Sequence, residues 1–280
     1  MLVSSGVDAA LLGVLGLLIG SFLNVVIYRL PVMLEAQWKA ECADMQGQEL
    51  PESAPFNLMV PRSRCQKCGH QLSWFENVPI VSYLILRGKC RSCATPISVR
   101  YPLIELAVGA LFAYCGWHWG ANATGLAWCG FGAALLALGM IDWDTTLLPD
   151  SITLPLLWAG LICAALKWTH VALPDAFWGA VAGYMSLWLV YWAFKLVTGK
   201  DGMGFGDFKL FAALGAWFGW QALIPIILMS SVIGAVIGIA MKFTSGLREG
   251  GYIPFGPFLA GAGLTAMLAG PNAILKAIGL

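Results

Sequence analysis

Two pairs of cysteines give the clearest indication of chemistry in this sequence. Each pair has two residues inside it, and residues 69–89 separate the pairs, whose members are Cys65, Cys68, Cys90 and Cys93. Paired thiolates at this spacing are typical of ribbon-type zinc sites, in which two short turns each supply two ligands to one ion. In an oxidising compartment the same residues would form two disulfides instead. The compartment therefore decides between the two interpretations.

Two aspartates form a second candidate set. Asp142 ends one apolar segment, and Asp207 begins another directly after Gly204 and Gly206. The glycines remove side-chain bulk, so backbone from a partner or substrate can approach closely. Two aspartates brought together can share one proton, with the ionised member activating water and the protonated member polarising a carbonyl, as in aspartic proteases.

Other polar residues are interpreted as structural. With three histidines in the chain, no Ser/His/Asp or Cys/His arrangement competes with the aspartates. The glycines at 202–206 follow no predicted strand and match no phosphate-binding pattern. We interpret three further aspartates as charges at helix ends: Asp144, Asp150 and Asp201.

The composition excludes a soluble domain with a single core. The 280 residues are 59% hydrophobic and 11% charged, with a mean hydropathy of +0.76, which is typical of an integral membrane protein. Aspartates at membrane depth are costly and are functional candidates for that reason. A net charge of +1 gives no indication of a nucleic-acid partner.

Eight segments approach the roughly 20 apolar residues that a helix needs to cross a bilayer. The sixth and seventh meet near Trp220, where a single kinked span is the alternative. Arg29 directly follows the first segment and no basic residue precedes it, which favours a retained span over a secretory signal peptide. The expected spans are 9–28, 102–119, 124–141, 152–168, 174–194, 206–220, 221–241 and 254–275.

Basic residues lie mainly on one side of these expected spans. Fourteen of the 16 Lys and Arg residues share a side with the loop 29–100, and only Lys167 and Lys276 lie on the other. The positive-inside rule makes the richer side the cytoplasm. This bias favours eight spans over seven and places the four paired cysteines in a reducing compartment, where disulfides are rare.

The loop between the first two spans is expected to fold only in part. Residues 35–57 are polar and acidic, which indicates a linker or an insertion, and the folded part spans about 60–100. A domain of that size buries too little surface to be stable alone, so a structural Zn²⁺ on the cysteines would supply folding free energy. Iron, a redox dithiol or unligated thiols are the alternatives. His70 could replace one ligand, although a turn residue is the simpler interpretation.

With these motifs in this order along the sequence, the chain resembles the type IV prepilin peptidases. These are membrane aspartic proteases with a G-x-G-D motif. The resemblance covers nearly the whole chain. It includes the segment Gly20–Pro31, the paired cysteines, the segment Arg100–Glu105 and both aspartate motifs. Residue by residue, it implies that Asp142 and Asp207 are the catalytic pair, supported by Gly204 and Gly206.

The resemblance also implies a reaction and its partners. Members cleave the basic leader of prepilins and pseudopilins after Gly at the cytoplasmic face of the bacterial inner membrane. They then N-methylate the new amino terminus with S-adenosylmethionine, and their partners are these substrates and membrane lipid. For methyl transfer we single out Glu105, the only Glu within an expected span. Its structural alternative is a Glu that pairs with Arg100 or finds its polar partner on a neighbouring helix.

The predicted fold is an all-α polytopic membrane protein with a small cytoplasmic zinc domain between its first two helices. We expect a first transmembrane helix at 1–30, a loop with the zinc domain at 31–100 and a membrane peptidase domain at 101–280. The alternative function is an ion-coupled transporter that uses the two carboxylates, and a third is a structural scaffold for a secretion machine. The sequence leaves open which pilins are processed, the oligomeric state and where the methyl donor binds.

Overall fold

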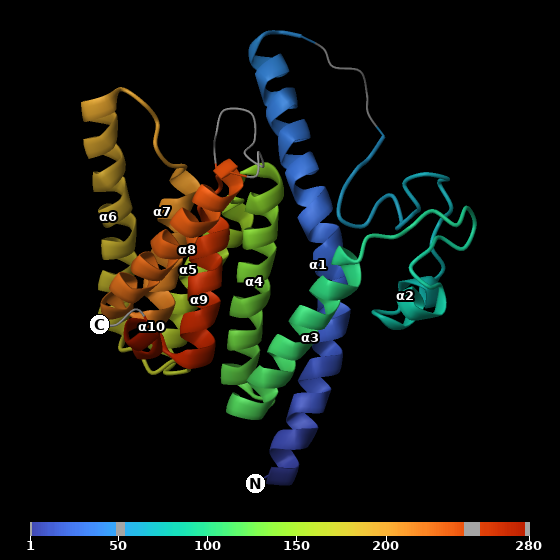
Figure 1. Cartoon of the computed structure of the whole chain (residues 1–280), viewed down its shortest axis with the longest axis horizontal. Coiled ribbons are helices and arrows are strands. Elements are labelled where there is room, and N and C mark those ends of the chain that lie inside the picture. The colour runs from blue at the N-terminus through green and yellow to red at the C-terminus, as the bar shows by residue number, and fades with distance from the viewer. Residues whose placement is uncertain (1, 49–53, 244–252, 278–280) are drawn as a thin grey trace. The chain divides into compact units, whose positions relative to one another are not determined.

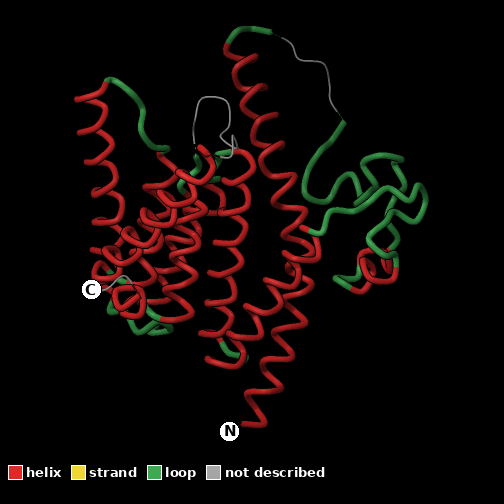
Figure 2. The backbone as a smooth tube through the Cα atoms, in the orientation of Figure 1, coloured by secondary structure: helices red, strands yellow, loops and turns green. Residues whose placement is uncertain are grey.

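Helices form the regular structure of the described part of the chain, residues 2–48, 54–243 and 253–277, in this computed structural model (Figures 1 and 2). This confirms the all-helical prediction. Two isolated β-bridges, Arg64 with Gln71 and Lys89 with Pro96, are the only extended pairing among those residues. The α-helices are α1 (Leu2–Met45), α2 (Val81–Ile85), α3 (Arg100–Trp119), α4 (Ala123–Thr145), α5 (Asp150–Ala165), α6 (Leu173–Thr198), α7 (Phe205–Phe218), α8 (Leu223–Phe243), α9 (Gly256–Ala269) and α10 (Pro271–Ala277).

The chain divides into two compact units, Met1–Cys129 and Gly130–Leu280, with the boundary inside α4. The paired cysteines and Glu105 lie in the first unit. Both candidate catalytic aspartates lie in the second.

In the first unit, α1 and α3 pack through small residues. A Cβ at Gly16 would lie 2.6 Å from Cβ of Phe112, and a Cβ at Gly20 would lie 2.7 Å from Cα of Glu105. Glycine therefore lets the two backbones approach closely, as is common between helices in membranes.

The expected linker at 35–57 is helical as far as Met45, so this part of the prediction was wrong. The residues after Val32 are mostly straight-chain helix formers, which hold the helix without an apolar face. One turn is further supported by a 2.8 Å hydrogen bond from Gln37 Nε2 to Glu41 Oε1. The helix ends just before Gly47, whose φ is 65°.

Four of the described helices are long and apolar enough to cross a membrane: α1, α4, α6 and α8 with the 3₁₀ turn Trp220–Ala222 before it. The protein is an integral membrane protein. Helices α5 and α9 are apolar but shorter. Two breaks refine the expected spans. Gly219 (φ 81°) separates α7 from the turn before α8, and Gly270 (φ 83°) before Pro271 divides the segment 254–275 into α9 and α10.

Helix α7 forms the core of the second unit. It is apolar all round, and its residues Leu210–Trp217 are buried, as expected for a helix enclosed by others. It crosses α6 where a Cβ on Gly179 or on Gly215 would overlap the carbonyl oxygen of the other. On its α5 side, Trp217 Nε1 donates a 2.8 Å hydrogen bond to the carbonyl of Leu156. These contacts fix the helix whose first turn contains Asp207.

Candidate active site and metal centre

The structure brings the two predicted aspartates together. Asp142 lies in the last turn of α4 and is 4% exposed, and Asp207 lies in the first turn of α7 and is 7% exposed. They are close enough for the charge of Asp142 to act on Asp207. Oδ1 of Asp207 is buried with no hydrogen-bond partner within the described ranges. Two buried carboxyl groups facing one site can exchange protons with a water or a substrate.

The glycines before Asp207 have separate roles. Gly206 lies against the α4–α5 connection, because a Cβ there would lie 2.6 Å from Cβ of Leu148. A Cβ at Gly204 would lie 3.6 Å from Oδ2 of Asp207, an ordinary contact. The carbonyl of Gly204 instead accepts a 3.2 Å hydrogen bond from the backbone N–H of Asp207. Gly206 thus makes a close contact with a side chain of this chain, and the approach of partner or substrate backbone stays a prediction.

Sequence reasoning missed Gly256 and Leu148. A Cβ at Gly256 would lie 2.6 Å from Oδ2 of Asp142 and 3.1 Å from Cδ1 of Leu148. The first turn of α9 therefore packs directly on the carboxylate. The available signal was a glycine followed by Pro257 at the start of an apolar segment, a pattern that marks a helix start but no site.

Charges around this site are paired. Lys209 Nζ donates to both carboxylate oxygens of Asp150, at 2.6 and 2.7 Å, and so joins α7 to the start of α5. Asp201 accepts a hydrogen bond from the hydroxyl of Tyr191 at 2.6 Å and pairs with Lys195 at 2.8 Å. Asp150 lies in the first turn of α5, which agrees with its interpretation as a charge at a helix end. Asp201 lies instead in the connection between α6 and α7.

The four paired cysteines converge in the first unit. Their Sγ atoms all lie within 4.8 Å of one another, with 3.8 Å between Cys65 and Cys93 and 3.9 Å between Cys68 and Cys90. Tetrahedral Zn²⁺ with Zn–S bonds of about 2.3 Å requires S···S distances of about 3.8 Å. The set is therefore the right size and chemistry for one ion of this kind.

The two cysteine turns have the same backbone form. In one, the N–H of Cys65 donates to the carbonyl of His70 at 2.8 Å, and in the other, the N–H of Cys90 donates to the carbonyl of Thr95 at 2.9 Å. The residue after each second cysteine has a positive φ, 71° at Gly69 and 55° at Ala94. Such turns direct N–H groups toward sulfur and favour thiolates, which are the metal-binding form.

Hydrogen bonds favour the thiolate form of two of these cysteines. The Thr95 hydroxyl, 3.2 Å from Cys93 Sγ, and the backbone N–H of Thr95 lower the pKa of the Cys93 thiol to about 6. Backbone N–H groups of Cys68 and Lys67 lower the pKa of the Cys65 thiol. Both sulfur atoms therefore favour the negatively charged thiolate form, which binds a metal cation.

His70 is paired with Glu76 and lies outside the group of four sulfurs. Its Nε2 lies 3.3 Å from Oε2 of Glu76, which is buried, and the same oxygen accepts a 2.8 Å hydrogen bond from the N–H of Ser73. The Ser73 hydrogen bond is the main cause of a lowered pKa of Glu76, and His70 adds to it. His70 thus supports the fold around the cluster and is not among its candidate ligands.

Glu105 has a structural partner. It is buried in the second turn of α3, and its Oε2 accepts a 2.7 Å hydrogen bond from the backbone N–H of Ile80. Ile80 has φ 60°, which is unfavourable for a β-branched residue, so the carboxylate stabilises a strained turn. The partner is thus the loop backbone rather than the neighbouring helix we considered.

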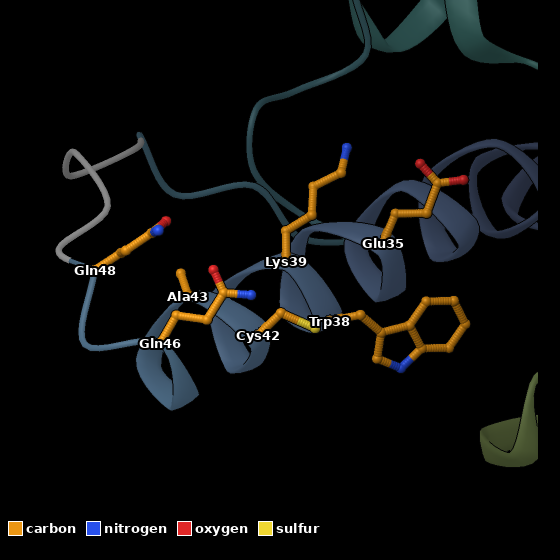
Figure 3. Close-up of a pocket in the computed structure, with 7 residues that line it drawn as sticks. All are labelled: Glu35, Trp38, Lys39, Cys42, Ala43, Gln46 and Gln48. Atoms are coloured by element: carbon orange, nitrogen blue, oxygen red, sulfur yellow. The ribbon is translucent and has the colours of Figure 1, made fainter.

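One further hollow, of about 400 Å³, lies along the last turns of α1 (Figure 3). Trp38 and Cys42 are on its wall, and none of the predicted site residues is. It is a shallow surface feature of one helix and its following turn.

Family models match two parts of the chain. The model described as the Bacterial Peptidase A24 N-terminal domain matches residues 14–119, and that of the Type IV leader peptidase family matches residues 129–239. The first match contains the cysteines and Glu105. The second contains Asp142 and Asp207.

Relatives named prepilin leader peptidase/N-methyltransferase align with most of the chain. The protein of Stutzerimonas stutzeri is 54% identical over 258 residues, which cover 92% of this chain and 89% of that protein. The protein of Pseudomonas putida is 52% identical with the same coverage, and that of Aeromonas hydrophila is 51% identical, covering 91% and 89%. No solved structure matches the chain.

Identity at half of the positions across nine-tenths of both chains leaves no room for a chance likeness. Both family models fall on the regions in which the candidate residues gather. The chain belongs to the type IV leader peptidase family.

Proposed function

We propose that this chain cleaves the leader of prepilins and pseudopilins after Gly and then N-methylates the new amino terminus. The observation that supports the proteolytic step best is the meeting of Asp142 and Asp207, two buried carboxyl groups from separate helices. No other pair of acids in the described residues combines burial with mutual electrostatic contact in this unit.

The two aspartates divide the chemistry of water attack. Like charges at close range favour a state in which the pair holds one proton. The ionised member takes a proton from water as the water oxygen attacks the scissile carbonyl, and the protonated member donates its proton to the carbonyl oxygen. Collapse of the tetrahedral intermediate then breaks the C–N bond, and the amine leaves with a proton from the first aspartate.

A direct assay tests this function. Purified protein incubated with a prepilin peptide should yield a product shorter by the leader, identified by its mass, and heavier by one methyl group once S-adenosylmethionine is added. Family membership gives no support to the alternative, an ion-coupled transporter, which would leave the peptide intact. A scaffold would also leave it intact.

We propose that Cys65, Cys68, Cys90 and Cys93 hold one structural Zn²⁺ as thiolates. The sulfur distances fit this ion, and the ion would stabilise a small domain with few buried residues.

Replacing one ligand, Cys90→Ser, is expected to lower metal content from one ion per chain to near zero, because three thiolates bind zinc far more weakly than four. Proteolysis should fall only in part, since the aspartates lie in the other unit. Elemental analysis of protein purified without chelator measures this. Cys42→Ser is the matched control, because Cys42 is exposed and outside the cluster. A wild-type chain without zinc would contradict the proposal.

For the second activity we propose S-adenosylmethionine as the methyl donor and Glu105 as a residue that aligns the substrate amine. Methyl transfer needs a deprotonated amine aligned with the sulfonium of the donor. Glu105 already stabilises the strained backbone at Ile80, so it could act through this loop as well as directly.

Glu105→Gln is expected to slow methylation of a pre-cleaved pilin by about 10-fold while cleavage persists. Glutamine retains an oxygen that can accept the Ile80 hydrogen bond, so the fold should survive. Methyl incorporation and peptide cleavage are measured separately on the same preparation. The control is Glu35→Gln, a change at an exposed glutamate of α1. Equal loss of both activities would assign Glu105 to packing alone.

We further propose eight spans in a bacterial inner membrane, with the aspartates and the cysteine loop on the cytoplasmic face. In this arrangement residues 1–30 are the first span, 31–100 the loop domain and 101–280 the peptidase domain. The charge bias of the sequence supports it, as 14 of 16 basic residues fall on that side.

Reporter fusions measure this orientation. Fusions after residues 60, 148 and 202 are expected to report the cytoplasm, and fusions after 121 and 171 the opposite side. The positions after 148 and 202 precede α5 and α7, so they flank the two aspartate segments. If these two emerged on opposite faces, the proposed single active site could not form.

A further inference from the structure

The loop between α1 and α3, which contains the four paired cysteines, exposes an unusual set of apolar side chains. We call it the metal-binding loop. Trp74 is 79% exposed, Val81 51%, Leu84 67% and Ile85 74%. Val81, Leu84 and Ile85 are spaced i, i+3 and i+4 in α2, so they share one face of the helix. A group of large apolar side chains exposed within so short a segment is a candidate contact surface. We call these four residues the apolar face of the loop.

The depth of this face is fixed by Glu105. The N–H of Ile80, immediately before α2, donates to the Glu105 carboxylate at 2.7 Å. Glu105 is five residues past the start of α3 at Arg100, which at 1.5 Å per residue is about 7.5 Å along the helix. Helix α2 therefore begins beside the second turn of α3, within the same unit, and not beyond the end of α3 (Figure 1).

Helix α3 is apolar on its outer surface at that level. Leu103 and Leu106, which flank Glu105 in sequence, are 58% and 54% exposed. In an integral membrane protein, exposed leucines of this kind are suited to contact with lipid. The apolar face of the loop lies level with these exposed leucines of α3.

Basic residues follow the apolar face directly. Arg87, Lys89 and Arg91 come within a few residues of Ile85, and all three are exposed. Cations at the edge of an apolar surface bind phosphate groups of phospholipids, and Trp is enriched at the level of the headgroups. Apolar side chains with a basic edge are typical of segments that lie in a membrane interface.

We propose that the segment Trp74–Ile85 inserts its apolar face into the interface of the phospholipid bilayer and anchors the metal-binding loop there. The buried Glu105 carboxylate sets its depth by holding the strained turn at Ile80. The loop is thus a membrane-associated element rather than a domain suspended in the aqueous phase. This inference concerns the first unit and is independent of the proposed reaction.

A photo-crosslinking experiment tests the partner. A diazirine amino acid replaces Leu84 in the full chain, which is loaded with zinc and reconstituted in phosphatidylcholine bilayers. Illumination is expected to give a phospholipid adduct, identified by mass. The same amino acid at Gln66, an exposed polar position of the first cysteine turn, should react with water only. A cross-link from position 84 to protein, or reaction with water alone, would overturn the proposal.

The unmodified chain gives a second measurement in case the labelled variant folds poorly. A diazirine-bearing phospholipid should label the peptide 74–85 as well as α1, and Ile85→Lys should reduce labelling of that peptide at least 3-fold with metal content unchanged. Gln71→Lys, at an exposed polar position of the same loop, should leave labelling unchanged. Labelling of α1 without labelling of 74–85 would contradict insertion.

Discussion

Replacing either Asp142 or Asp207 with asparagine is expected to lower the rate of prepilin cleavage by about 10²–10⁴-fold, the usual contribution of a general acid or base. Asparagine keeps the shape of the side chain but can neither accept a proton from water nor donate one to the carbonyl. Neither acid can fill both roles, so each single change should have nearly the full effect. Cleavage of a prepilin peptide by purified protein in detergent measures the rate.

Two neighbouring acids provide the controls. Asp144 is exposed, and Asp150 pairs with Lys209, so Asp144→Asn and Asp150→Asn should both retain measurable activity. The membrane content and thermal unfolding of all four variants should match those of the parent protein. Full activity in Asp142→Asn together with its loss in Asp144→Asn would show that the catalytic acid is the other member of this motif.

Gly256→Ala is expected to lower cleavage by about 10²-fold while the protein stays folded, because a misplacement of about 1 Å at a catalytic group can cost that much. The new Cβ would lie 2.6 Å from Oδ2 of Asp142, closer than real carbon atoms approach, so either the carboxylate or the first turn of α9 must move. Movement of the carboxylate displaces Asp142 from Asp207.

The matched control lies on the same helix. A Cβ at Gly261 would meet nothing within 4 Å, so Gly261→Ala should leave activity unchanged and add slightly to helix stability. Substrate affinity and turnover, measured separately, show where the Gly256→Ala loss occurs. Equal activity in the two variants would mean that the turn of α9 adjusts without disturbing the carboxylate.

The candidate residues could be predicted from the sequence because each belongs to a short motif whose residue types and spacing indicate a chemical role. Two cysteine pairs at this spacing indicate a metal site, and an acid at the end of an apolar segment is a functional candidate. The structure then added what only packing determines. Contact of Asp142 with Gly256 depends on α9, which is more than one hundred residues away in the chain, and no local pattern reports it.

The helix boundaries, too, could be predicted from the local sequence only in part. Apolar segments predicted where helices lie, but hydropathy could not distinguish a helix that faces lipid from one that other helices enclose. Helix α7 is as apolar as a span, yet it is short and buried by its neighbours. The extension of α1 to Met45 was missed because helix formers without an apolar face resemble a linker in composition.

The glycine against Asp142 has a consequence for drug resistance. A compound that binds beside this carboxylate and the first turn of α9 would contact a position where any larger side chain collides with the proposed catalytic acid. Bacteria often escape inhibitors by enlarging a residue that lines the binding site. At Gly256 a larger side chain would disturb the proposed catalytic acid, so it would lower enzyme activity as well as inhibitor binding. Escape variants should therefore arise at positions farther from Asp142.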